Sequence, residues 1–438
     1  MPWTTLTLTT TTPVFNGPDG VLRVSSLRGA LRYWFRALVG TRIGNDPEAL
    51  GELEEAVFGG TTAQSRVQFR LPKAPDPVQR SKSSPRPETW RSKPWVGYLL
   101  GQGHTQHNNG GNDMTPTPPG REFSLKIRWA HSARSGRTAE DEAINSLVMS
   151  SLWLLCTFGG IGARTRRGFG GLRITDSDGA LPGLWSEGER ARTPGLEFYQ
   201  QLEHLGLCAE SGSPAVARPY TEALRESLEH AATLTPKAQA DRADPTRRPW
   251  YPVLSPEYTA AGISAYQHET WEGLAEHVGR QYRLARATRS NRKSETRYEP
   301  KVKTPEYIAL TEGTSQPPFR LGAFGLPVNF KDPYSVNAET AQNAPLRRAS
   351  PLWFRFVSNV EGTQWRLFSF AFHNSYFSGE QEGGNGPRVV ARKGSTQHGP
   401  KRTVPDTEVE KHTRDWITRM ANHEAPFPDA SATEESNT

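Results

Sequence analysis

Residues 159–172 read GGIGARTRRGFGGL, which places six glycines and three arginines within fourteen residues, directly after an apolar helical pattern. Glycine lets the backbone approach a ligand without a Cβ clash, and exposed backbone N–H groups in such a turn form a concave anion site. Arg164, Arg166 and Arg167 add guanidinium groups, which suit phosphate. The stretch therefore predicts an anion site, and a nucleic-acid phosphate backbone fits it best. The alternative is a flexible turn whose arginines face water.

Two nucleotide-binding motifs of similar composition do not match this stretch. After Gly162 the next glycine is Gly168, which breaks the G-x-G-x-x-G pattern, and no GK[ST] follows any glycine-rich run. We therefore expect neither an ATP nor an NAD site, and no cofactor.

The elements around the glycine stretch follow the order strand, helix, strand, strand, helix, strand. Hydrophobic periodicity predicts an opening strand that ends at Pro13, strands at residues 67–71, 123–129 and 172–175, and helices at residues 27–38, 47–57 and 139–158. This order is the split βαβ arrangement of ferredoxin-like and RNA-recognition folds. We expect an α+β fold whose first domain spans residues 1–180 and carries a Pro- and Gly-rich insertion at residues 72–121.

The length of 438 residues allows a second domain, which we place at residues 181–438. Helices are expected there as insertions, and a helix at the C-terminal end. The predicted helices are residues 196–208, 220–232, 269–289 and 405–422, and the predicted strands are residues 319–330, 352–360 and 363–372.

The first helix has two faces. One face is apolar and is expected in the core together with Tyr33 and Trp34. Along another stripe Arg28, Arg32 and Arg36 recur every four residues. This stripe would extend the phosphate-binding surface if the helix packs beside the glycine stretch, although charged helix faces are ordinarily just solvated.

Basic residues outnumber acidic ones, 53 to 46, which gives a net charge of +7. A second group of arginines recurs every three residues and forms a broad band on a helix, able to meet RNA or an acidic protein. Its members are Arg280, Arg283, Arg286, Arg289 and Arg292.

The two cysteines, Cys156 and Cys208, lie in apolar helical patterns, so no disulfide framework is expected. The first residues lack a secretory signal, and the longest apolar run, residues 152–158, is far short of a membrane span. We expect a cytoplasmic protein without a membrane partner.

Three other residues are weighed as sites. His104 and His107 lie in a Gly/Asn-rich stretch without a nearby Cys or acidic cluster, so no metal site is predicted. Asp19 lies in Gly-Pro-Asp-Gly, an ordinary turn sequence, and the turn interpretation is preferred to a catalytic one.

Several motifs together resemble the RAMP superfamily of CRISPR proteins. They are TPVFNG at residues 12–17, SSLRGALRYWFR at residues 25–36, Phe58-Gly59 and the glycine stretch. Within the superfamily the likeness is to the two-domain family of the first subunit of the type III-B Cmr effector complex. FGLPV at residues 324–328 and RRASPL at residues 347–352 match more weakly.

The resemblance implies tandem ferredoxin-like RAMP domains and no catalytic activity of its own. It also implies guide RNA and target RNA as ligands near the guide 3′ end, and other RAMP subunits of the Cmr complex as partners. RAMP ribonucleases use a loop aspartate in this region, which keeps Asp19 as the basis of one alternative, a RAMP endoribonuclease. A second alternative is a scaffold that binds only proteins.

The sequence-based hypothesis is a non-catalytic RNA-binding subunit in antiviral defence. Arg28, Arg32 and Arg36 of the first helix would grip phosphates together with the glycine stretch. Phe169 would either stack on a base or pack inward. The RNA-binding residues expected within the stretch are Gly160, Gly162, Arg164, Arg166, Arg167 and Phe169.

Overall fold

The structure is a computed structural model, and it describes most of the chain between residues 2 and 422. The described residues are 2–17, 19–61, 63–74, 93–101, 116–131, 138–208, 214–235, 248–286, 312–313, 319–329, 334–340, 342–376, 388–399 and 403–422.

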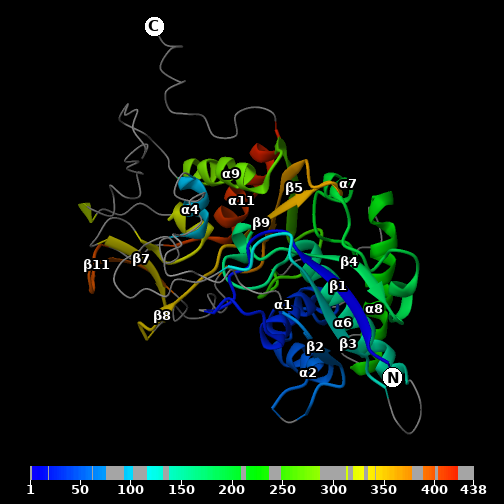
Figure 1. Ribbon diagram of the computed structural model, residues 1–438. Coiled ribbons are helices and arrows are strands. Elements are labelled where there is room, and N and C mark those ends of the chain that lie inside the picture. Colours follow the sequence, from blue (N-terminus) through cyan, green and yellow to red (C-terminus); the bar gives the residue numbers. More distant parts are fainter. Residues whose placement is uncertain are drawn as a thin grey trace.

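The first sheet has the predicted ferredoxin-like topology (Figure 1). Its strands are β1 (Thr4–Thr10), β2 (Gln68–Arg70), β3 (Glu122–Arg128) and β4 (Leu172–Asp178). They pair in the order β2-β3-β1-β4, and all neighbours are antiparallel. Helix α1 (Val24–Ile43) follows β1, and α6 (Ala139–Phe158) connects β3 to β4. The split βαβ order therefore follows from the sequence periodicity, and the α+β class is confirmed.

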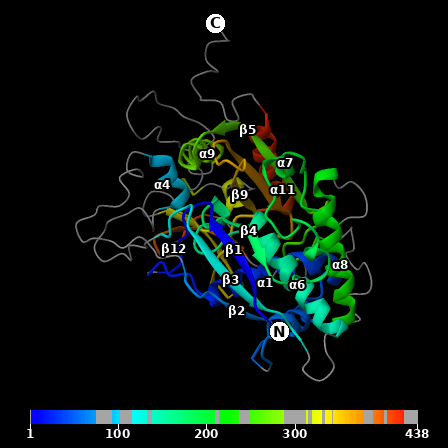
Figure 2. The same ribbon diagram turned by 45° about the vertical axis from the view of Figure 1, so that its right-hand side comes forward.

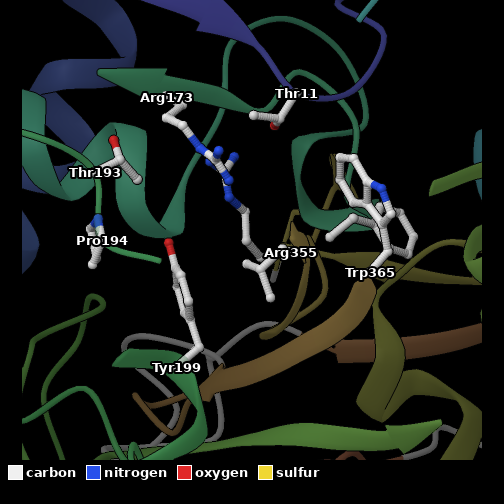
Figure 3. Close-up of a pocket in the computed structure, with 9 residues that line it drawn as sticks. Thr11, Arg173, Thr193, Pro194, Tyr199, Arg355 and Trp365 are labelled. Atoms are coloured by element: carbon white, nitrogen blue, oxygen red, sulfur yellow. The ribbon is translucent and has the colours of Figure 1, made fainter. Parts of the chain in front are cut away.

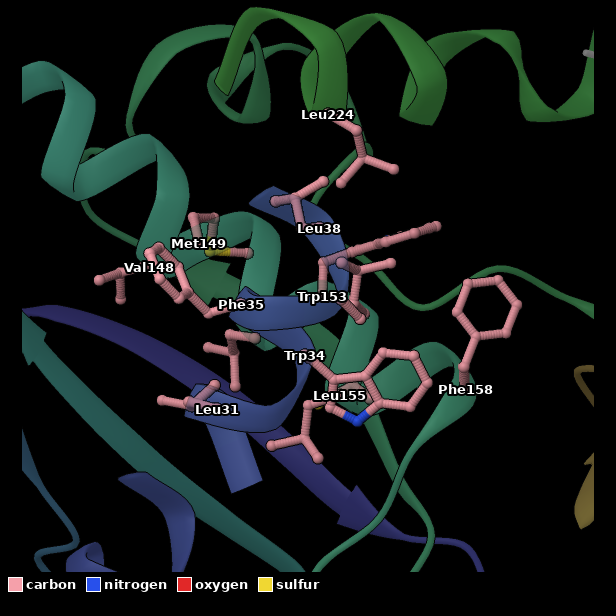
Figure 4. Close-up of a cluster of buried hydrophobic side chains, with 14 of the residues drawn as sticks. Leu31, Trp34, Phe35, Leu38, Val148, Met149, Trp153, Leu155, Phe158 and Leu224 are labelled. Carbon is pink, nitrogen blue, oxygen red and sulfur yellow. The ribbon is translucent and has the colours of Figure 1, made fainter. Parts of the chain in front are cut away.

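Helix α6 holds the first half together because it is buried on nearly every side. A capping box fixes its start, since the Thr138 side chain accepts from the backbone N–H of Asp141 and the Asp141 carboxylate accepts from that of Thr138. Its Phe158 ring lies 6.1 Å from that of Trp34 of α1, and its side chains cluster with Phe35 of α1 and with Leu224 of the neighbouring helix α8 (Arg218–Leu234), as Figure 4 shows. The helix ends at Phe158, where the glycine stretch begins.

The second sheet is three-stranded among the described residues, in the order β5-β10-β9. Its strands are β5 (Thr259–His268), β9 (Leu352–Ser358) and β10 (Trp365–Phe372), and its helices are α9 (Trp271–Ala285) and α11 (Asp406–Ala421). The order β5, α9, β9, β10, α11 matches a ferredoxin-like domain in which no described strand takes the fourth position.

Smaller elements surround these two sheets. The helices are α2 (Pro47–Phe58), α4 (Pro94–Leu100) and α7 (Leu196–Gln200). A third sheet joins β12 (Thr396–Gln397), β11 (Arg388–Lys393), β7 (Tyr334–Glu339) and β6 (Val328–Asn329), and β8 (Pro345–Leu346) pairs with β7. No described helix has both the length and the apolar character needed to cross a bilayer.

Three element predictions were wrong. The expected strand at residues 319–330 is a 3-10 helix, Arg320–Phe324, followed by the two-residue strand β6, because glycines and Pro327 interrupt the ladder. The expected helix at residues 196–208 stops at Gln200, because the Glu203 carbonyl accepts instead from Ala261 N of β5, at 2.7 Å. Helix α4, within the expected loop at residues 72–121, was not predicted.

The two halves share a continuous core. Trp34 of α1 lies 5.8 Å from Trp353 of β9, centroid to centroid, and 6.3 Å from Phe370 of β10. Helix α8 lies beyond the expected domain boundary, yet its Ser227 hydroxyl lies 2.7 Å from that of Ser150 in α6. The domain boundary at residue 180 stays a prediction. We call the contact between the half with the first sheet and the half with the second sheet the seam, and the glycine stretch lies at this seam.

Candidate nucleic-acid interface

The backbone of the glycine stretch packs against the chain that follows β1. The Ala163 N–H donates to the Phe15 carbonyl at 2.7 Å, and the Gly170 N–H donates to the Pro13 carbonyl at 2.9 Å. Gly160 is buried, and a Cβ there would come within 2.7 Å of the Gly170 oxygen. The expectation that these amides form an open anion cradle is therefore corrected, because the close approach permitted by glycine serves internal packing.

Gly162 is the exposed glycine of this stretch. Its φ of +89° lies in the region that favours glycine, and a Cβ would collide with the Phe15 carbonyl. The turn at Gly162 therefore has a structural cause, and it also leaves this backbone at the surface.

Arg166 and Arg167 point into the seam between the two halves. Arg166 Nη1 donates to the Ser350 carbonyl at 2.9 Å, and its guanidinium lies 4.9 Å from the Trp353 ring centroid. The Arg167 guanidinium lies 4.2 Å from the Tyr282 ring centroid, and burial lowers the pKa of Arg167. These two arginines stabilise the seam, which corrects their expected exposure to a phosphate.

Phe169 is 1% exposed and packs inward, which is one of the two expected alternatives. Its ring makes edge contacts with Phe15 at 5.8 Å and with Trp271 at 6.3 Å, measured between centroids. Stacking on a base is therefore not open to Phe169 in this structure.

Arg164 remains exposed and borders a cationic surface. Its guanidinium lies beside Gly101, the residue that ends α4, since a Cβ there would come within 2.8 Å of Arg164 Nη2. Next to it, Arg286 Nη1 donates to the Tyr98 hydroxyl at 3.2 Å, and the Arg283 guanidinium lies 5.9 Å from the Tyr98 ring centroid. We call Gly162, Arg164, Tyr98, Arg283 and Arg286 the loop rim.

Arg164 and Arg286 of the loop rim both lie close enough to Arg167 for their charges to act on it. Burial is the main cause that lowers the pKa of Arg167, and the positive charges of Arg286 and Arg164 lower it further. Burial also lowers the pKa of Arg164. These guanidiniums stay protonated, so positive charge is concentrated where the loop, α4 and α9 meet.

The arginine stripe of α1 is largely engaged with α2. Glu54 is 7% exposed, and its carboxylate forms ion pairs with Arg32 at 3.3 Å and with Arg36. Arg32 Nη2 also donates to the Gly59 carbonyl at 2.6 Å, and the Arg28 guanidinium lies 5.9 Å from the Phe69 ring centroid. The stripe joins two helices, which corrects the expectation that it extends the phosphate surface.

Comparison with known proteins identifies the family. The RAMP superfamily profile matches residues 7–173. The chain is 30% identical over 158 residues to "CRISPR system Cmr subunit Cmr1-2" of Pyrococcus furiosus, covering 34% of this chain and 81% of that protein. This chain belongs to the Cmr1 family of the RAMP superfamily. It is also 25% identical over 360 residues to Cmr1-1 of the same organism, covering 80% of this chain and 82% of that one.

Two solved structures resemble this Cmr1 family member. The crystal structure of apo Cmr1 from Pyrococcus furiosus has a TM-score of 0.48 at 21% identity and covers 89% of this chain and 94% of its own. A chain from the cryo-EM structure of the type III-B Cmr-beta bound to cognate target RNA has a TM-score of 0.40 at 11% identity, with coverages of 94% and 99%.

Arg355 of β9 is an important residue of this Cmr1 family member that the sequence analysis missed. It is 4% exposed, and its guanidinium donates to the carbonyls of Gly159 at 2.9 Å, Cys156 at 2.6 Å and Leu172 at 2.5 Å. One side chain thus ties the end of α6 to both stems of the glycine stretch. The available signal was a single charged residue within the apolar run LWFRFVS.

A small cavity lies beside Arg355 at the same seam (Figure 3). Arg173 of β4 reaches toward Arg355 and donates to the Ser358 hydroxyl at 3.1 Å. The Tyr199 hydroxyl donates to the Thr157 carbonyl at 2.9 Å, and burial raises the pKa of Tyr199 to about 12. The polar side chains that line this cavity form their hydrogen bonds mainly with other protein groups. We therefore interpret the cavity as a packing feature of the seam and not as a ligand site.

Asp19 has the geometry of a turn residue. Its carboxylate accepts from the Val21 N–H at 3.1 Å and forms an ion pair with Arg23, and the Arg23 hydrogen bond lowers the pKa of Asp19. A lowered pKa makes a carboxylate a weaker base. No group of three potential metal-ligating side chains occurs among the described residues. His104, His107, Arg289 and Arg292 lie outside the described ranges.

Proposed function

We propose that this chain is a non-catalytic RNA-binding subunit of a type III-B Cmr effector complex. It would contact guide or target RNA near the guide 3′ end, with other RAMP subunits as neighbours. Membership of the Cmr1 family supports the assembly, since two relatives are named as Cmr subunits. The observation that carries the RNA contact is the loop rim, where no described carboxylate bonds to Arg164 or Arg283.

The loop rim suits a phosphate backbone. Arg164 is partly desolvated yet exposed, so its charge acts on a bound phosphate with less screening than a fully solvated side chain. Tyr98 offers a half-exposed ring beside Arg283 and Arg286. Contacts of this kind hold the backbone without reading bases, so base pairing with the guide would supply the specificity.

The structure leaves fewer arginines accessible to RNA than the six expected from the sequence. The RNA affinity should therefore depend less steeply on salt concentration. If Arg164 and Arg283 each met one phosphate, the slope of log affinity against log salt would be roughly −1.4 on single-stranded RNA. Exposure of all six arginines of the glycine stretch and the first helix would instead give roughly −4. Titrations between 50 and 200 mM salt distinguish the two slopes.

The double variant Arg164→Ala with Arg283→Ala is expected to weaken binding of a labelled single-stranded RNA about tenfold at 0.15 M salt, because two phosphate contacts are lost. The slope should become shallower by roughly 1.4. Fluorescence anisotropy on the full chain measures both quantities. The control removes two exposed cations elsewhere, Arg347→Ala with Lys411→Ala. Equal losses in the two double variants would contradict the role of the loop rim.

The endoribonuclease alternative predicts a different result for Asp19→Ala. Because the Asp19 carboxylate is engaged by Arg23 and the Val21 amide, we expect neither RNA affinity nor RNA integrity to change. Incubation of the full chain and the variant with end-labelled RNA, followed by denaturing electrophoresis, measures both. Cleavage by the native chain that Asp19→Ala abolishes would establish the ribonuclease and end the non-catalytic proposal.

A further inference from the structure

The first sheet has one covered and one open face. On β1, Leu6 and Leu8 are buried, whereas Thr5, Thr7 and Thr9 alternate with them and stay partly exposed. Both α1 and α6 pack on the apolar side, as Figures 1 and 2 show. Since successive side chains of a strand point to opposite faces, the threonines mark the face that no described helix covers.

Three cationic side chains lie on this open face. They are Arg70 of β2 and Lys126 and Arg128 of β3. Lys126 of β3 lies opposite Thr5 of β1 on one side and opposite Arg70 of β2 on the other. Arg128 lies one pleat further along β3, opposite Gln68. Neighbouring strands are about 4.8 Å apart, so the three charges are close to one another. No carboxylate within the described ranges bonds to any of them.

An aromatic ring and several hydroxyls accompany these charges. The Arg70 guanidinium lies 4.6 Å from the Trp3 ring centroid, and Trp3 is partly exposed. Toward the middle of the sheet Thr7 lies opposite Ser124, so hydroxyl groups continue the face along β1. We call Trp3, Gln68, Arg70, Lys126 and Arg128 the β2–β3 face.

The acidic residues of the sheet flank β1 on this open face: Asp178 lies opposite Thr5, Asp176 opposite Thr7 and Glu122 opposite Thr9. Asp176 and Asp178 are exposed on β4, beyond β1, and Asp176 pairs with Arg192 at 3.3 Å. Glu122 lies at the other end of β3 from Arg128. An anionic ligand would therefore lie over β2 and the Lys126–Arg128 end of β3, away from these carboxylates.

We propose that the β2–β3 face binds the sugar-phosphate backbone of single-stranded RNA, as a second contact surface beyond the loop rim. This inference rests on the proposed function. The occupant follows from charge complementarity, because Arg70, Lys126 and Arg128 offer cations at strand spacing, with hydroxyl donors and a ring beside them. A protein partner would instead require an apolar centre, and apart from Trp3 this face presents polar and charged side chains.

The two surfaces lie toward opposite ends of β1. Strand β1 runs from Thr4 beside Lys126 to Thr10, and the next residue, Thr11, donates its N–H to the Gly171 carbonyl at 2.8 Å. At about 3.3 Å per residue, Thr5 and Thr11 are roughly 20 Å apart. Because Asp178, Asp176 and Glu122 flank β1 between these points, the β2–β3 face and the loop rim are separate contacts for RNA.

The test is the triple variant Arg70→Ala, Lys126→Ala and Arg128→Ala in the full chain, measured with a labelled single-stranded RNA of about twenty nucleotides. Loss of three phosphate contacts should weaken binding by about 10- to 100-fold at 0.15 M salt and make the log-log salt slope shallower by roughly 2. The control variant removes three exposed cations elsewhere, Arg218, Arg347 and Lys411, and so changes the net charge equally. Circular dichroism of both variants checks that each is folded.

Four outcomes separate this inference from the proposed function. A loss confined to the β2–β3 triple variant supports the inference. Equal affinity and slope in the two triple variants overturn it, while a loss in Arg164→Ala with Arg283→Ala would leave the loop rim standing. Unchanged RNA affinity combined with failure to assemble with neighbouring Cmr subunits would make the face a protein interface and also overturn the inference. Absence of RNA binding by the native chain would remove both proposals.

Discussion

Replacing Arg355 by alanine is expected to lower the free energy of unfolding by about 1–3 kcal/mol, because three carbonyl oxygens lose their shared buried donor. The Arg355 guanidinium is the shared donor to three carbonyls, those of Cys156, Gly159 and Leu172. Without it, these oxygens are left in an interior where water does not easily replace a donor. Urea denaturation followed by tryptophan fluorescence measures the loss.

Two further variants sharpen this test. Arg355→Lys keeps the charge but not the planar fork, so it should recover only part of the stability. Arg347→Ala removes an exposed arginine and should change the free energy of unfolding by less than about 0.5 kcal/mol. Burial raises the pKa of the Cys156 thiol to about 12, and the Arg355 charge acts in the opposite direction. Cys156 should still react faster with a thiol reagent in Arg355→Ala, because a less stable fold exposes the thiol more often. Native stability in Arg355→Ala would refute the assignment of Arg355 as the tie between the halves.

The second large effect is a loss of stability in mild acid, centred on His373. This side chain is 1% exposed, and its Nε2 lies 3.0 Å from the Thr413 hydroxyl. Its pKa is lowered from 6.5 to about 4, mainly by burial; the charges of Arg414 and Arg248 act in the same direction, and Glu410 opposes them. The folded state therefore excludes a proton that the unfolded chain accepts below pH 6.5.

The sign of the pH effect follows from this difference. Stability is complete above about pH 6.5 and falls as the pH drops toward 4, by up to about 1.4 kcal/mol per pH unit for His373. His277, whose pKa burial also lowers to about 4, acts in the same window. Urea denaturation at pH 7, 6, 5 and 4.5 measures the dependence. His373→Asn should flatten the curve and the exposed His131→Asn should not. Parallel curves for native chain and His373→Asn would disprove the assignment.

The glycine stretch acts chiefly as a joint between two halves of the molecule. Its backbone packs on the segment after β1, and Arg166 and Arg167 reach under β9 and the Arg320–Phe324 turn. Only part of it, around Gly162 and Arg164, faces outward next to α4 and α9. A ligand at this loop would therefore contact both halves at once. RNA binding there would depend on the packing of the two halves, which Arg355 stabilises.

Local periodicity predicted the four strands of the first sheet and the long helices, but it missed strands β5, β7 and β11. The alternation in residues 123–129 and the apolar stripe of residues 139–158 correspond to β3 and α6. It failed where long-range contacts decide the backbone, as at Glu203, whose carbonyl pairs with β5. Helix α4 was missed because only seven residues are helical, and they are stabilised by packing on α9 rather than by a long periodic pattern.

For the site residues too, the sequence was informative within a local motif and failed where long-range contacts decide. Arg164 was identified because an arginine next to glycines is visible in a local motif. The structure shows that the Arg164 side chain is exposed. For the first helix, the sequence does not show that Glu54, eighteen residues beyond Arg36, returns to form ion pairs with Arg32 and Arg36. The β2–β3 face was not anticipated, because Trp3, Arg70 and Lys126 are distant in sequence and meet only through strand pairing.

The sequence by itself determined the helical and strand periods, the glycine turns and the likeness to the RAMP superfamily, because each depends on residues near one another in the chain. Only the tertiary structure decided which arginines face solvent. Arg355 is buried, and Arg166 and Arg167 are turned into the seam and only partly exposed, because two sheets close over the same loop, whereas Arg164 and the cations of the β2–β3 face lie outside that contact. Burial of a guanidinium is a property of the whole packing arrangement, and no local pattern of residues contains it.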